Sequence, residues 1–113
     1  MFNETELYII KASLEMILKD EEPKTGSVWD IEEKMKELGY EVKRPEFIRS
    51  FNKLKWKRYL EEFAYGKKKV IYFYVPNLEK EEVAEAIKQL GYQPEEIESF
   101  INSYVEKRSS VKK

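Results

Sequence analysis

The chain has 113 residues, a formal net charge of −1 and 42% hydrophobic residues, which is enough for one domain with a single core. It contains no cysteine and no histidine, which excludes disulfide scaffolds, zinc fingers, cysteine nucleophiles and histidine-based acid–base chemistry. No apolar run approaches the roughly 18 residues that span a bilayer, and the acidic start is unlike a signal peptide, so we expect a cytoplasmic protein without a membrane partner.

The first two predicted elements are amphipathic helices. The first begins near Asn3, where Glu6 three residues later is typical of a helix start, and ends near Asp20. Its apolar residues recur at helical spacing: Leu7, Ile10, Leu14, Ile17 and Leu18. A shorter helix follows over 28–38, and Gly39 stands where helices commonly end in a left-handed residue.

The third predicted helix spans 45–58 and carries a basic face. Pro45 suits its first turn, because the missing N–H costs nothing there. At 3.6 residues per turn, one side collects the apolar residues Phe47, Phe51 and Leu54. The opposite side collects Arg49, Asn52, Lys53 and Trp56, so these side chains are expected to face away from the core. Trp56 either contacts a partner there or, as we favour, packs at the junction with the next strand.

A β-hairpin is predicted over 59–75, because two β-prone runs flank a glycine-containing turn at 65–68. Its tip carries three consecutive lysines, Lys67, Lys68 and Lys69.

Two further helices complete the chain. Asn77 is expected to cap the first of them, which Gly91 closes, and Pro94 opens the second. Residues 108–113 are expected to form a disordered tail.

Charge is segregated along the sequence. Residues 1–42 carry a net charge of −6, residues 43–70 a net +7 and residues 71–106 a net −6. Such asymmetry indicates a binding partner better than the overall charge does. The abundance of lysine and glutamate is also typical of proteins adapted to high temperature, and we expect a thermophilic, archaeal source.

The order of elements resembles the winged helix-turn-helix family. The matching stretches are VWDIEEKMKELG for the second helix, KRPEFIRSFNKL for the recognition helix and RYLEEFAYGKKKVIYFYV for the wing. The resemblance covers residues 5–76 and implies an α+β, mostly α fold with three helices, a β-hairpin wing and two additional C-terminal helices. We therefore expect a winged-helix domain over 1–76 and a helical pair over 77–107, packed on that domain or at a dimer interface. Many family members lead into the wing with a Gly-Leu pair, where this chain has WKRYL.

The resemblance also implies binding of double-stranded DNA, with the recognition helix in the major groove and the wing on the backbone. On this chain, Arg49, Asn52 and Lys53 would then reach base edges, while the cations at the helix start and wing tip would contact phosphates. The residues expected to bind DNA are Lys43, Arg44, Arg49, Asn52, Lys53, Trp56, Lys57, Lys67, Lys68 and Lys69. We expect a small transcriptional regulator that acts as a homodimer, since one recognition helix reads few base pairs.

Other functions remain open. A basic helix face is often merely solvated. The alternative function is a protein-interaction adaptor in a transcription, replication or membrane-remodelling assembly, and a less favoured third is binding of RNA or single strands through Trp56 and the hairpin aromatics. The sequence shows no nucleophile–base pair, glycine-rich phosphate loop or metal-ligand cluster, so we predict no enzyme activity, cofactor, metal or small-molecule ligand.

Overall fold

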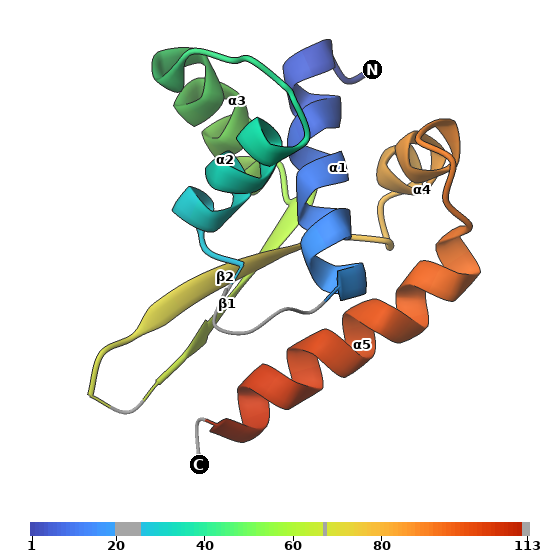
Figure 1. Ribbon diagram of the computed structural model, residues 1–113. Helices are drawn as coiled ribbons and strands as arrows, with labels where there is room; N and C mark the ends of the chain where they lie inside the picture. Colours follow the sequence, from blue (N-terminus) through green and yellow to red (C-terminus); the bar gives the residue numbers. More distant parts are fainter. Residues whose placement is uncertain (20–25, 67, 112–113) are drawn as a thin grey trace.

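The computed structural model describes residues 1–19, 26–66 and 68–111. In these ranges the protein is α+β and mostly helical, with five helices around a two-stranded antiparallel hairpin (Figure 1). The elements are α1 (Glu4–Lys19), α2 (Val28–Glu37), α3 (Arg44–Trp56), β1 (Leu60–Tyr65), β2 (Ile71–Pro76), α4 (Glu81–Gln89) and α5 (Pro94–Val111). The predicted third helix and hairpin are thus confirmed, with boundaries that differ by one or two residues.

Local sequence signals account for the starts and ends of the first helices. The side-chain oxygen of Asn3 accepts a 2.8 Å hydrogen bond from the backbone N–H of Glu6, whose carboxylate accepts a 2.7 Å bond from the N–H of Asn3. This reciprocal pair confirms the predicted start of α1. Ser27 and Asp30 form the same arrangement at the start of α2. Gly39 follows α2 with a φ of 87°, the predicted left-handed end.

The first three helices share one part of the core. Ile9, Ile31 and Met35 pack there against the apolar side of α3. Phe47, Phe51 and Leu54 are almost completely buried, so the predicted core face of α3 is confirmed.

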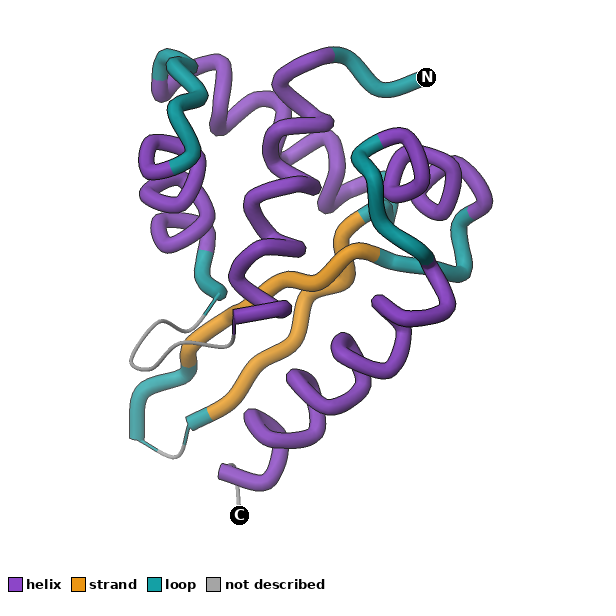
Figure 2. Tube along the Cα trace, turned by 45° about the vertical axis from the view of Figure 1, so that its right-hand side comes forward, coloured by secondary structure: helices purple, strands orange, loops and turns teal. Residues whose placement is uncertain are grey.

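The hairpin packs on both of its faces, because alternate residues of a strand point to opposite sides. On one face the Tyr74 ring meets Phe51 of α3 edge-on, with centroids 4.8 Å apart. On the other face Phe73 is fully buried and meets Tyr104 of α5, with centroids 6.0 Å apart. Figure 2 shows α5 running beside the hairpin. The N–H of Tyr74 also donates a 3.2 Å bond to the carbonyl of Gly26, just before α2.

The C-terminal helices share the second part of the core with α1 and β2. Ile97, Ile101 and Tyr104 of α5 lie in one buried cluster with Leu14 and Phe73. The described part of the chain contains no helix that is both long and apolar enough to cross a membrane.

Two predictions for this region are wrong. Asn77 does not cap α4, which begins at Glu81 after Lys80; its buried amide instead donates a 2.8 Å bond to the carbonyl of Arg58. The predicted tail is helical as far as Val111, because Arg108 is buried with its guanidinium 3.4 Å from the centre of the Tyr104 ring. Residues 112–113 of that tail lie outside the described residues.

Candidate nucleic-acid interface

The outward side of α3 presents a row of polar and aromatic side chains. Pro45 lies in the first turn, and the apolar residues of the helix bury the opposite side. Arg49 is exposed, and Asn52, three residues later, is half-buried. Residues three and four apart are neighbours on a helix surface, so Arg49 and Asn52 lie next to each other with Trp56 one turn further on. This row can form hydrogen bonds with a partner that has a groove wide enough for a helix.

Trp56 does not pack at the junction between α3 and β1, so that interpretation is wrong. Its side chain is 75% exposed. The junction is filled instead by Leu60, which is 1% exposed, and by Tyr59, whose ring meets that of Phe2 edge-on at 4.9 Å. The remaining interpretation, a contact with a partner, is compatible with this position.

Arg44, at the start of α3, is bound to the preceding helix. Its Nε donates to Oε2 of Glu32 at 3.0 Å, and its Nη2 donates to Oε1 of the same carboxylate at 2.7 Å. These bonds hold the pKa of Glu32 below its ordinary value, although burial acts in the opposite direction. The guanidinium also lies over the Trp29 ring, 4.9 Å from its centre. Arg44 therefore orients α3 on α2, while the neighbouring Lys43 stays exposed.

Lys53 leans toward α1 rather than straight outward. Its Nζ lies 3.4 Å from a carboxylate oxygen of Glu6, which is almost completely buried. Thr5 of the same helix donates a 3.3 Å bond to Glu46 of α3. Lys53 thus takes part in the contact between α1 and α3, although about half of its side chain stays exposed.

The hairpin tip carries the second group of cations. Lys68 and Lys69 are exposed, and Lys67 lies outside the described residues. Figure 1 shows the tip and α3 on the left of the molecule, with α4 on the right. The face of β2 that packs on α3 through Tyr74 continues, two residues nearer the tip, as the half-exposed Tyr72.

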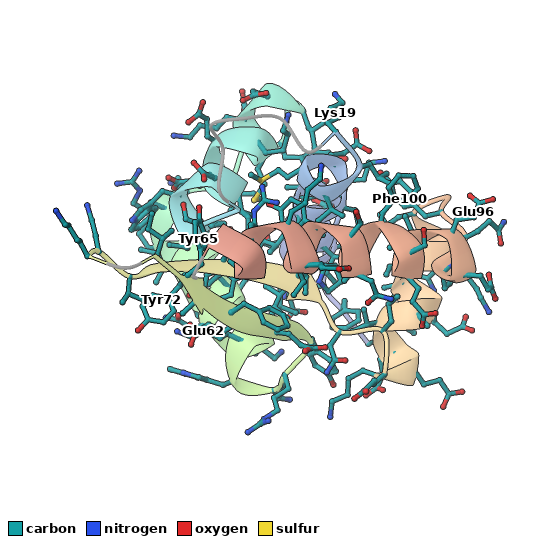
Figure 3. All side chains as sticks on the ribbon, turned by 90° about the horizontal axis from the view of Figure 1, so that it is seen from below. Lys19, Glu62, Tyr65, Tyr72, Glu96 and Phe100 are labelled. Carbon is teal, nitrogen blue, oxygen red and sulfur yellow. The ribbon has the colours of Figure 1, made fainter. Side chains whose placement is uncertain are left out.

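One carboxylate lies on this same face of the hairpin. Glu62 pairs with Tyr74 across the two strands and accepts a 2.7 Å bond from its hydroxyl. Burial, and secondly this bond, raise the pKa of Tyr74 well above its ordinary value. Figure 3 shows Glu62 and Tyr72 on the side of the hairpin away from α5, with Tyr65 beside that helix. Any anionic partner must lie clear of the Glu62 carboxylate.

The left-handed conformation of Arg58, which lies between α3 and β1, was not predicted from the sequence. Its φ of 61° is the only positive value among the described residues other than glycine. The signal was present in the sequence, since WKRYL replaces the Gly-Leu pair that many winged helices have at this point.

Comparisons with protein-family models, with curated proteins and with solved structures give no match to this chain. Within the described ranges, no three acidic, histidine or cysteine side chains cluster in a way that could hold a metal ion. Support for a function therefore comes from the geometry of the chain itself.

Proposed function

We propose that this chain is a double-stranded DNA-binding protein of the winged-helix type that acts as a small transcriptional regulator in the cytoplasm. The observation that carries the proposal is the pair formed by the exposed Arg49 and the half-buried Asn52 on the outward side of α3. Neither side chain has a hydrogen-bond or ion-pair partner in the described part of the chain. Arginine pairs with guanine and asparagine with adenine in the major groove, which accepts an α-helix.

The surrounding cations take different roles in this proposal. Lys43, Lys57, Lys68 and Lys69 are exposed and would contact phosphates at the two ends of the surface. Lys67 belongs to this set by sequence alone. Arg44 and Lys53 already face carboxylates, so their main role is to hold α3 at its angle to α2 and α1. A homodimer would bring two copies of α3 to half-sites about one helical turn of DNA apart.

Fluorescence anisotropy with a labelled random-sequence duplex tests this proposal. If binding neutralises about six phosphates, the affinity should fall roughly 10³-fold when the salt concentration is raised from 50 to 200 mM. Arg49→Ala combined with Lys69→Ala should weaken binding at least tenfold at low salt. Lys88→Ala is the control, because it removes an exposed cation from α4. Equal binding by the native protein and the double variant, or no binding at low salt, would contradict the proposal.

A protein-interaction adaptor is the second candidate, and exposed aromatic side chains favour it. Trp56 is 75% exposed and Ile48, on the same side of α3, is 37% exposed, while Trp29 of α2 is 51% exposed. Tryptophan is enriched among the side chains that dominate protein–protein binding energy. The adaptor function predicts a stoichiometric protein partner that survives nuclease treatment and is lost with Trp56→Ser. DNA binding predicts instead that nuclease abolishes any co-purification.

A further inference from the structure

Arg58 occupies a position where the backbone favours glycine. Helix α3 ends with a 2.9 Å bond from the N–H of Tyr59 to the carbonyl of Leu54 and a 3.1 Å bond from the N–H of Arg58 to the carbonyl of Lys55. This pattern places a left-handed residue at Arg58, a position that is usually glycine because a Cβ atom is strained there. The φ of 61° confirms the conformation.

A buried asparagine holds Arg58 in this conformation. The side-chain amide of Asn77 donates a 2.8 Å bond to the Arg58 carbonyl, and the backbone N–H of Asn77 donates a 2.9 Å bond to the carbonyl of Tyr59. Its Oδ1 accepts a 3.1 Å bond from the N–H of Glu79, so every polar group of the Asn77 side chain contributes to this junction. Strained residues that the surrounding structure fixes in place occur preferentially at functional sites. The arginine side chain is therefore a candidate for a binding role.

Arg58, whose side chain is exposed, lines a groove of about 570 Å³ at the base of the hairpin, hereafter the junction groove. Lys55 of α3 and Lys80, just before α4, line it as well. None of these three cations has an ion-pair partner among the described residues. The groove thus offers three positive groups from separate segments of the chain.

The junction groove also has an acidic part, formed by Glu61 and Glu79. Burial and then the charge of Glu79 raise the pKa of Glu61, and no neighbouring cation offsets them. Neither carboxylate forms an ion pair with another described residue. Glu62 lines the groove too, but its carboxylate accepts the hydroxyl of Tyr74.

We propose that the junction groove binds a small molecule that carries both an anionic group and an ammonium group. Arg58, Lys55 and Lys80 hold the carboxylate or phosphate, and Glu61 and Glu79 hold the ammonium. A nucleic-acid backbone offers only anionic groups, which the carboxylates repel, so this site is distinct from the proposed DNA surface. The proposal for the junction groove does not depend on DNA binding.

A ¹H–¹⁵N chemical-shift titration of the full chain tests the groove with four probes. O-phosphoethanolamine carries phosphate and ammonium, β-alanine carries carboxylate and ammonium, and inorganic phosphate and ethylamine each carry a single charged group. We expect one of the two-charge probes to bind at least tenfold more tightly than either single-charge probe, with shifts at 58–62 and 77–80. The stronger of the two then identifies the anionic group.

Variants separate binding from folding. Arg58→Gly removes the guanidinium but relieves the backbone, so it should weaken binding at least tenfold without lowering the melting temperature. Glu61→Gln should remove the advantage of the two-charge probes over phosphate. Lys57→Ala is the matched control, because Lys57 is an exposed neighbour that does not line the groove. The proposal is overturned if no probe binds, if the two-charge probes have no advantage, or if Arg58→Gly binds like the native protein.

Discussion

Arg44 of α3 and Glu32 of α2 form a two-point ion pair that joins the two helices. Both carboxylate oxygens of Glu32 accept a bond from the guanidinium, at 3.0 and 2.7 Å. The Glu32 side chain is nearly buried, whereas that of Arg44 is more than half exposed. The planar fork of arginine fits a carboxylate at two points, which a lysine cannot do. The pair therefore fixes the angle of α3 through an interaction that orients as well as attracts.

Replacement of Arg44 should destabilise the fold. Arg44→Ala leaves the nearly buried carboxylate of Glu32 without its partner, so the urea midpoint of unfolding should fall. Arg44→Lys should recover only part of the loss, because it offers a single contact point. Lys68→Ala, at the exposed hairpin tip, is the control and should leave the midpoint unchanged. Equal midpoints for Arg44→Ala and Lys68→Ala would show that the ion pair does not stabilise the protein.

The same pair should make stability depend on pH in the acid range. Because the pKa of Glu32 is lowered in the folded state, the unfolded chain takes up the proton first as the pH falls. The contribution of Glu32 is thus complete above the ordinary glutamate pKa of about 4.3 and is lost as the pH falls through the lower folded value. Glu32→Gln should cost about 1 kcal/mol at pH 7. Urea unfolding of both proteins at several pH values should show this difference shrinking below pH 4.3; a constant difference would contradict the assignment.

Arg58→Gly should stabilise the protein by about 1 kcal/mol, because glycine adopts a positive φ without the Cβ strain. Arg58→Ala removes the same charge but keeps the Cβ atom, so its free energy of unfolding should stay close to that of the native protein. Chemical denaturation of the three proteins measures the effect. If both variants were more stable than the native protein, repulsion of the Arg58 charge, and not strain at its Cβ atom, would be what lowers the stability.

Gly26 and Gly39 should respond differently to alanine. Both have a positive φ, 77° and 87°, so each substitution should cost about 1 kcal/mol from the backbone alone. A Cβ atom at Gly26 would also lie 2.5 Å from the Tyr104 hydroxyl oxygen, whereas one at Gly39 meets nothing within 4 Å. Gly26→Ala should therefore be the more destabilising change in thermal unfolding. Tyr104→Phe should reduce this extra cost in a double-mutant cycle, and an unchanged difference would show that the hydroxyl is not its cause.

Much of the fold could be predicted from the sequence, because its signals are local. The apolar spacing of α3 predicts the burial of Phe47, Phe51 and Leu54, and the pairing of Asn3 with Glu6 predicts the start of α1. These features need only helical periodicity and hydrogen bonds between residues three positions apart.

Contacts between side chains that lie far apart in the sequence could not be predicted in this way. Lys53 is exposed, as helical geometry predicted, but periodicity within α3 could not reveal its contact with Glu6 of α1. Asn77 resembled a helix cap, yet its amide bonds to Arg58, 19 residues earlier. Periodicity placed Trp56 correctly on the outward side, and the general tendency of tryptophan to be buried then led to the wrong preference.

The packing of the hairpin on both faces has a mechanical consequence. Tyr74 is braced against Phe51 on one side, and Phe73 against Tyr104 on the other. The hairpin should therefore resist bending at its base, because bending would separate aromatic rings that are in close contact on one side or the other. The lysines at the hairpin tip are therefore held in a fixed position relative to α3. A partner that contacts both the tip and α3 has to change its own shape to fit them.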